Sequence, residues 1–194
     1  MNMVEQIMRW VKKLLSGETT FSETKRKWHE KDKTIYLSVT SDDTTGPEWI
    51  KRFKSKGLND EDCTKQLLCS SDFKPTDGKR YKVVILKGRL FEPKDLAMVN
   101  IEAEAKKRNI SKPNAEVACL IHEMLTYKDF EDMGLWHIIT MHEPIKNIHG
   151  EQSLLGTSSY DGKYYFRAGD CNYDSNWNSN CGFAFVSPEV SSQP

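Results

Sequence analysis

A histidine that is followed directly by a carboxylate has an arrangement used in acid–base chemistry and in metal-assisted hydrolysis. His122-Glu123 and His142-Glu143 both have this arrangement. A zinc protease places its second histidine one helical turn after the first, in the order H-E-x-x-H. Neither pair continues in that order, so the zinc-protease geometry is absent from both.

Three histidines lie close together in the sequence and could converge on a metal ion; they are His137, His142 and His149. His137 and His142 have an odd separation on and just after a predicted strand, so their side chains are expected on opposite faces. His149 falls in the next turn. Structural or surface roles are therefore favoured, and no metal or cofactor is expected. The alternative kept open is a metal-assisted hydrolase that uses His122, Glu123, His142 and His149.

Other catalytic signatures are missing from the sequence. It contains no G-x-S-x-G elbow, no phosphate loop and no dinucleotide fingerprint. The cysteines are odd in number and none are at C-x-x-C spacing, which argues against a complete disulfide framework. Cys171 and Cys181 can pair only if their strands lie side by side, which the sequence leaves open. We therefore do not expect an enzyme.

The stretch from Tyr164 to Cys181 differs in composition from the rest of the chain. It reads YYFRAGDCNYDSNWNSNC and contains no Lys, Glu, Gln or Met. A turn-rich loop explains the Asn, Asp, Ser and Gly, but not the Tyr content, the cysteines or the avoidance of Lys and Glu. Tyr, Ser, Gly and Asn are also the main residues of antibody recognition loops, where Tyr supplies contact area and the others supply adaptable hydrogen bonds. The composition therefore favours a binding surface.

The same stretch has a genetic interpretation. Asn codons that are randomised at their adenines can become Tyr, Ser, Asp, Gly, Cys, Arg or His, but never Lys, Glu, Gln, Met or Trp. Every suspected variable position holds a permitted residue; these positions are Tyr164, Arg167, Gly169, Asp170, Cys171, Asn172, Tyr173, Ser175, Asn176, Asn178, Ser179, Asn180 and Cys181. Other residues of this region can be encoded without adenine at the first two codon positions and would stay fixed; they are Phe166, Ala168, Trp177, Gly182, Phe183, Ala184, Phe185 and Val186.

An Asn-rich stretch with an interior Trp that ends in Gly182-Phe183-Ala184-Phe185-Val186 resembles the variable protein of a diversity-generating retroelement. The resemblance covers about residues 154–186. Looser similarity extends to 113–116 and 134–136, and Ala184 stands where many members of the family carry Arg. In that family a reverse transcriptase copies a template repeat with errors at adenines and overwrites the 3′ end of the gene.

The resemblance implies an α+β, C-type lectin-like fold, with a small mixed or antiparallel sheet, packed helices and a loop-rich C-terminal half. It also implies a non-catalytic display surface for a macromolecular ligand such as a protein or a cell-surface receptor. Aromatic anchors such as Tyr164 and Tyr173 would lie at the centre of this surface. The fixed aromatic residues would be buried, because substitutions are tolerated at exposed sites far better than in a core.

The elements that must position this surface alternate between helix and strand patterns. Strands are expected at 34–40, 81–86 and 135–141, and short strands at 154–155, 164–166 and 183–186. Helices are expected from Pro47 to Gly57, from Asn59 to about Cys69, from Pro93 to about Asn109, from Pro113 to Leu125, and from Thr126 or Tyr127 to Gly134.

The N-terminal part is expected to lie outside this domain. Residues 3–15 have apolar side chains at helical spacing, which predicts a helix that docks on the domain or joins subunits or a larger particle. The charged stretch 18–33 is typical of a connector or mobile arm. The predicted organisation is thus an arm over 1–33 and a domain over 34–194.

Charge and hydropathy limit the partners. Lys+Arg and Asp+Glu are both 28, so net charge indicates neither nucleic acid nor an anionic membrane. No apolar run reaches the ~20 residues of a membrane span. The N-terminus does not resemble a signal peptide, and a place on a virion or cell surface would need another export route.

Overall fold

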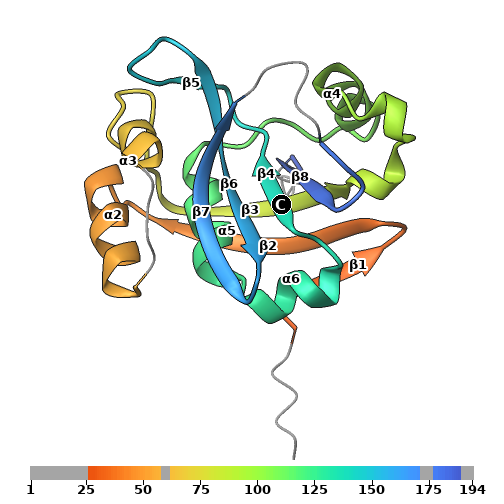
Figure 1. The fold of residues 1–194 in the computed structure, drawn as a ribbon, viewed down its shortest axis with the longest axis horizontal. Coiled ribbons are helices and arrows are strands. Elements are labelled where there is room, and N and C mark those ends of the chain that lie inside the picture. Colours follow the sequence, from red (N-terminus) through yellow and green to blue (C-terminus); the bar gives the residue numbers. More distant parts are fainter. Residues whose placement is uncertain (1–25, 58–61, 171–176, 189–194) are drawn as a thin grey trace, which may run out of the picture.

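A computed structural model describes residues 26–57, 62–170 and 177–188. It confirms the α+β class, with helices packed on a mostly antiparallel sheet (Figure 1). The strands follow the order β1-β2-β3-β8-β4-β6-β5, and β7 pairs with the other side of β6. The strands are β1 (Trp28–Lys31), β2 (Thr34–Asp42), β3 (Asp77–Lys87), β4 (His137–Thr140), β5 (Ile145–Lys146), β6 (Gln152–Tyr160), β7 (Lys163–Asp170) and β8 (Cys181–Val186).

Two tight turns connect the hairpins of this sheet. Asp32 and Lys33 have φ values of 50° and 57° between β1 and β2, and Asp161 and Gly162 have φ values of 51° and 70° between β6 and β7. Positive φ at both central residues is the geometry that matches the twist of a two-residue hairpin. Asp161-Gly162 is therefore the turn of the β6–β7 hairpin.

The helices begin and end where their capping residues dictate. In α6, Thr126 and Asp129 form a reciprocal capping box, and Gly134 ends the helix with φ at 64°. In α2, Thr45 and Glu48 form the same box, and a proline occupies the first turn. The α-helices are α2 (Gly46–Ser55), α3 (Asp62–Leu68), α4 (Met98–Lys107), α5 (Glu116–Met124) and α6 (Tyr127–Met133).

The sheet separates two apolar cores because successive strand side chains point to opposite faces. Ile85, Ile138 and Phe166 belong to a first core, which α2, α3, α5 and α6 cover. Leu86 and Phe183 belong to a second core, which α4 covers on the opposite face. The apolar run in β3 is thus explained by burial on both faces.

The predicted terminal strand lies in the middle of the sheet. β8 pairs antiparallel with β3 and parallel with β4. A Cβ on Gly182 would lie 2.7 Å from Ile85 Cγ2 and 3.0 Å from Leu135 Cδ1, so this position leaves no room for a side chain. Phe183 and Phe185 are 0% and 1% exposed. The motif 182–186 therefore forms the centre of the fold.

Two expectations about elements need correction, and one strand was not predicted. The charged stretch before Thr34 is not wholly an arm, since Trp28–Lys31 forms β1 and the Trp28 Nε1 donates to Asp129 Oδ1 at 2.8 Å. The predicted helix at Pro93 is a 3₁₀ turn followed by a separate helix, because Leu96 leaves the helical conformation at ψ 57°. Strand β5 carries too few residues for a sequence pattern. The helix predicted at 3–15 lies outside the described residues.

Candidate functional site

Alternation along β7 divides the predicted variable region into two faces. Phe166 is 1% exposed in the first core, and Tyr164 and Ala168 pack against that core. Arg167 and Gly169 therefore point to the opposite face. Helix α4 packs over the second core of that face, which contains side chains of β3, β4 and β8, while no side chain of β7 belongs to it. We call the side of β7 that carries Tyr165, Arg167 and Gly169 the open face; the β6 residues beneath it, such as Ser158, are buried.

Two tyrosines and one arginine form a cluster on the open face. The rings of Tyr160 and Tyr165 are stacked with centroids 4.7 Å apart. The Arg167 guanidinium lies 4.7 Å from the Tyr165 ring and 5.3 Å from the Tyr160 ring, and its Nη2 donates to Tyr160 Oη at 2.9 Å. The cluster presents rigid aromatic and cationic surface, the composition of binding hot spots.

Tyr160 and Tyr165 also belong to this surface, although neither was predicted as a site residue. Tyr165 alternates with Arg167, which places both on one face of a strand, and Tyr160 faces them across the hairpin turn. Asp-Gly between two strand patterns is a hairpin signal, and the register that it sets would have identified both residues.

The segment 177–180 continues the candidate surface. Trp177 packs its ring on Phe183, with centroids 5.1 Å apart, which ties the segment to the second core. Asn178 and Ser179 follow and are exposed. Asn180 N donates to Asn178 Oδ1 at 2.9 Å, so the segment turns sharply into β8. A fixed aromatic thus holds a short loop of polar side chains at the surface.

A neighbouring glycine and arginine support this loop. A Cβ on Gly88 would lie 2.4 Å from the carbonyl oxygen of Asn178 and 3.1 Å from Ser179 Cα, so only glycine allows the backbones to meet there. Arg89 Nη2 donates to Asn180 Oδ1 at 3.3 Å. The position of the loop therefore depends on residues far from it in the sequence.

A hollow of about 700 Å³ adjoins Asn180. It is lined by two exposed aromatics, Trp136 at 62% and Tyr160 at 42%, together with Arg89. Trp136 is fixed in place because its N–H donates to the Asn180 carbonyl at 2.9 Å and its carbonyl accepts from Ser159 N–H at 2.8 Å. The hollow lies between predicted variable and predicted constant positions.

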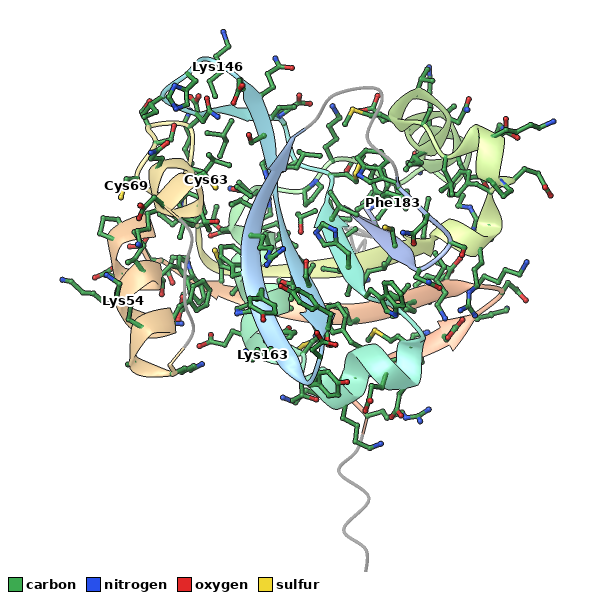
Figure 2. The ribbon with its side chains drawn as sticks, viewed as in Figure 1. Lys54, Cys63, Cys69, Lys146, Lys163 and Phe183 are labelled. Carbon is green, nitrogen blue, oxygen red and sulfur yellow. The ribbon has the colours of Figure 1, made fainter. Side chains whose placement is uncertain are left out.

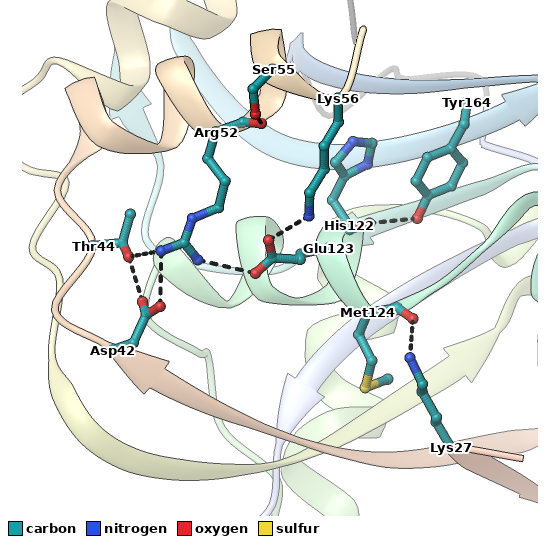
Figure 3. Close-up of polar contacts among 10 residues, drawn as sticks. All are labelled: Lys27, Asp42, Thr44, Arg52, Ser55, Lys56, His122, Glu123, Met124 and Tyr164. Carbon is teal, nitrogen blue, oxygen red and sulfur yellow. Dashed lines mark hydrogen bonds and ion pairs between the residues drawn. The ribbon is translucent and has the colours of Figure 1, made fainter. Parts of the chain in front are cut away.

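Two of the predicted ligand-binding residues do not lie on this surface. The Tyr164 ring stacks on His122 at 4.4 Å between centroids, and its hydroxyl donates to the His122 carbonyl at 3.1 Å (Figure 3). Burial raises the pKa of Tyr164 far above its usual value. Cys181 is 7% exposed in the second core, and burial raises the pKa of its thiol. Both predictions are corrected: these side chains belong to the cores because strand alternation directs them there.

The remaining predicted positions are only partly described. Asp170 ends β7 opposite Ser153. Five others lie outside the described residues: Cys171, Asn172, Tyr173, Ser175 and Asn176. The disulfide left open between Cys171 and Cys181 involves one of them, and Cys181 has a free thiol.

The histidine–carboxylate pairs do not form a converging site. His122 is 2% exposed between aromatic rings, and burial lowers its pKa to about 3. Glu123 points away from it to form ion pairs with Arg52 Nη1 at 3.1 Å and Lys56 Nζ at 2.6 Å (Figure 3). These contacts make Glu123 a connection between α5 and α2.

The other histidines have separate surroundings. Both ring nitrogens of His142 are engaged, Nδ1 by the Glu143 carbonyl at 2.7 Å and Nε2 by Leu155 N–H at 2.9 Å. Burial lowers its pKa to about 4. His149 is exposed in a turn, and burial lowers the pKa of His137 to about 4. Across the described ranges, no three His, Cys, Asp or Glu side chains are grouped closely enough to hold a metal ion.

Among the described residues, no helix is both long and apolar enough to span a membrane.

No protein-family model matches the chain, and no significant match is found with curated proteins or with solved structures.

Proposed function

We propose that this protein is a non-catalytic, hypervariable ligand-binding protein with a C-type lectin-like domain, diversified by adenine-directed mutagenesis as in diversity-generating retroelements. The observation that supports it is the division between the predicted fixed and variable residues. Phe166, Phe183 and Phe185 are at most 1% exposed, while Gly169, Asn178 and Ser179 are exposed; Tyr164 and Cys181 are the variable positions that depart from this division. A gene segment can vary without unfolding its product only when such a division exists.

The proposed recognition surface comprises the open face of β7, the loop 177–180 and the hollow beside Trp136. Tyr165 takes the place of Tyr164 as the aromatic anchor, because its ring faces outward with Arg167. Tyr offers a large contact area and few rotatable bonds, so little conformational entropy is lost on binding. Asn178, Ser179 and Asn180 add hydrogen-bonding groups that adapt to different ligands. This mixture fits a macromolecular partner, either a protein or a cell-surface receptor.

Constant residues contribute to the same surface. Trp136 precedes the predicted variable region of about 154–186, so the adenine-directed process would leave it unchanged. Its exposed ring at the hollow supplies contact area that every variant shares. Specificity then resides in the variable side chains and part of the affinity in the constant ones. The N-terminal helix, if it joins subunits, raises weak single-site affinity through multivalent display.

Sequencing of the gene and its flanking DNA in many isolates tests the proposal. We expect a near-copy of the segment that encodes residues 164–181 close to a reverse transcriptase gene. We also expect substitutions between isolates to fall on adenines of the variable codons and to spare the codons of Phe166, Trp177 and Phe183. Absence of the repeat, together with substitutions scattered evenly over the gene, would show that the proposal is wrong.

A further inference from the structure

A second surface lies at the β1 end of the sheet, away from the proposed recognition surface. It is a groove of about 540 Å³ that crosses β1, β2 and β3 and ends at Ser187. Four cationic residues line it, two from the start of the described chain and two from β3: Arg26, Lys27, Arg80 and Lys82. Within the described part of the chain, no Asp or Glu lines this groove.

The two cations of β3 are available to a ligand. Arg80 and Lys82 are exposed, and neither side chain makes a hydrogen bond or ion pair with any residue in the described ranges. They are two positions apart on one strand, so they project from the same face. Lys87, further along β3, instead pairs with Glu30 at 2.7 Å. The groove therefore contains positive charge without a counter-charge from its own lining.

The floor and the edge of the groove suit an extended chain. Tyr36 and Val84 provide apolar surface, and the Tyr36 ring is stacked on His29 with centroids 5.0 Å apart. β1 is the last strand on this side of the sheet, so among the described residues its outer edge pairs with no other strand. A segment that enters the groove over this edge can therefore form main-chain hydrogen bonds with β1 where it starts to cross towards Arg80 and Lys82 of β3.

The size of the groove limits the ligand. It crosses three strands, which are two strand spacings apart, and at ~4.8 Å each these give about 10 Å. An extended polypeptide advances ~3.3–3.6 Å per residue, so about three residues fit. Single-stranded nucleic acid is favoured less, because its bases stack on free aromatic faces. The rings of His29 and Tyr36 are stacked on each other, so each has only one face left for a base.

We propose that this groove binds a short, extended, acidic segment of a partner polypeptide, with Arg80 and Lys82 as the residues that recognise its carboxylates. The site is independent of the variable surface, so it would dock every variant to the same partner while the ligand of the variable surface changes. The proposal does not depend on the proposed function and can hold if that function is wrong.

The test measures binding of dye-labelled hexaglutamate to the full chain by fluorescence anisotropy at low ionic strength. The variant Arg80→Gln/Lys82→Gln removes both groove cations. The control Lys51→Gln/Lys54→Gln removes the same charge from exposed positions on α2, where Lys54 points outward (Figure 2). Because all four side chains are exposed, both variants should fold, and circular dichroism verifies this.

We expect the groove variant to bind hexaglutamate about tenfold more weakly than the unmodified chain, and the α2 variant to lose less than about twofold. Hexaglutamate should also slow amide hydrogen exchange in β1. Equal loss in the two variants, or unchanged exchange in β1, would reduce the interaction to general charge attraction and overturn the proposal. Tighter binding of an oligothymidylate of equal charge, with the same sensitivity to Arg80→Gln/Lys82→Gln, would also overturn it.

Discussion

The adjacent residues Tyr164 and Tyr165 face opposite sides of β7, so one substitution made at each separates core from surface. Tyr164→Ser removes a half-buried ring that stacks on His122 and a hydroxyl that donates to the His122 carbonyl at 3.1 Å. Full truncation of a buried aromatic costs about 3–5 kcal/mol, so a half-buried ring accounts for about 2 kcal/mol. The lost hydrogen bond adds about 1 kcal/mol, which gives a loss of about 3 kcal/mol in the free energy of unfolding.

For a domain of this size, each kcal/mol lowers the melting temperature by about 2–4 °C, so Tyr164→Ser should lower it by about 6–12 °C. Tyr165→Ser removes contacts with Tyr160 and Arg167 on the open face, and it should change the melting temperature by less than about 2 °C. Thermal unfolding followed by circular dichroism, with urea denaturation as a second measurement, distinguishes the two. Equal destabilisation, or a larger effect at Tyr165, would refute the assignment of the two faces.

Three further predictions follow from buried groups and close contacts. The pKa values of His122 and His142 are lowered to about 3 and 4, so between those values and the unfolded pKa of ~6.5 the unfolded chain binds more protons. The free energy of unfolding should therefore be highest above pH ~6.5 and should fall by up to about 1.4 kcal/mol for each histidine with every pH unit below that value. Equal urea midpoints at pH 7.5 and pH 5 would contradict this. Glu116→Gln should destabilise the fold by about 2 kcal/mol in urea, because the buried carboxylate accepts from Thr76 N–H at 2.7 Å and from Tyr81 Oη at 2.5 Å; an unchanged midpoint would show that the charge is dispensable. Gly88→Ala should cost about 1–3 kcal/mol and displace the loop that begins at Asn178, which amide chemical shifts would report; unperturbed shifts there would contradict the predicted contact.

Local patterns in the sequence predicted the elements whose ends are encoded nearby. Thr126 and Gly134 bound α6 as expected, and Pro47 lies in the first turn of α2. The strand predicted at 34–40 appears as β2. In each case the capping residue or the alternation lies within the element itself, so no distant contact had to be known.

The errors occurred where distant contacts decide the structure. β1 is short and charged, and only the pairing with β2 and the burial of Trp28 against α6 make it a strand. Alternation places Tyr164 and Tyr165 on opposite faces of β7, but which of the two faces the first core depends on distant contacts such as that of Tyr164 with His122 of α5. The hollow at Trp136 likewise combines residues from separate elements. Composition therefore located the candidate surface, whereas its membership required the register of β6 and β7.

The central claim is that exposed and half-buried positions of the C-terminal region can vary while the fold persists, and a pair of displayed libraries measures this most directly. One library places Asn-codon adenine variants at Arg167, Gly169, Asn178, Ser179 and Asn180, and the other places the same residues at Phe166, Phe183, Ala184 and Phe185. Protease resistance of each displayed member reports whether it is folded. We predict that most members of the first library and few of the second are resistant. Loss of resistance at similar frequency in both libraries would contradict the claim.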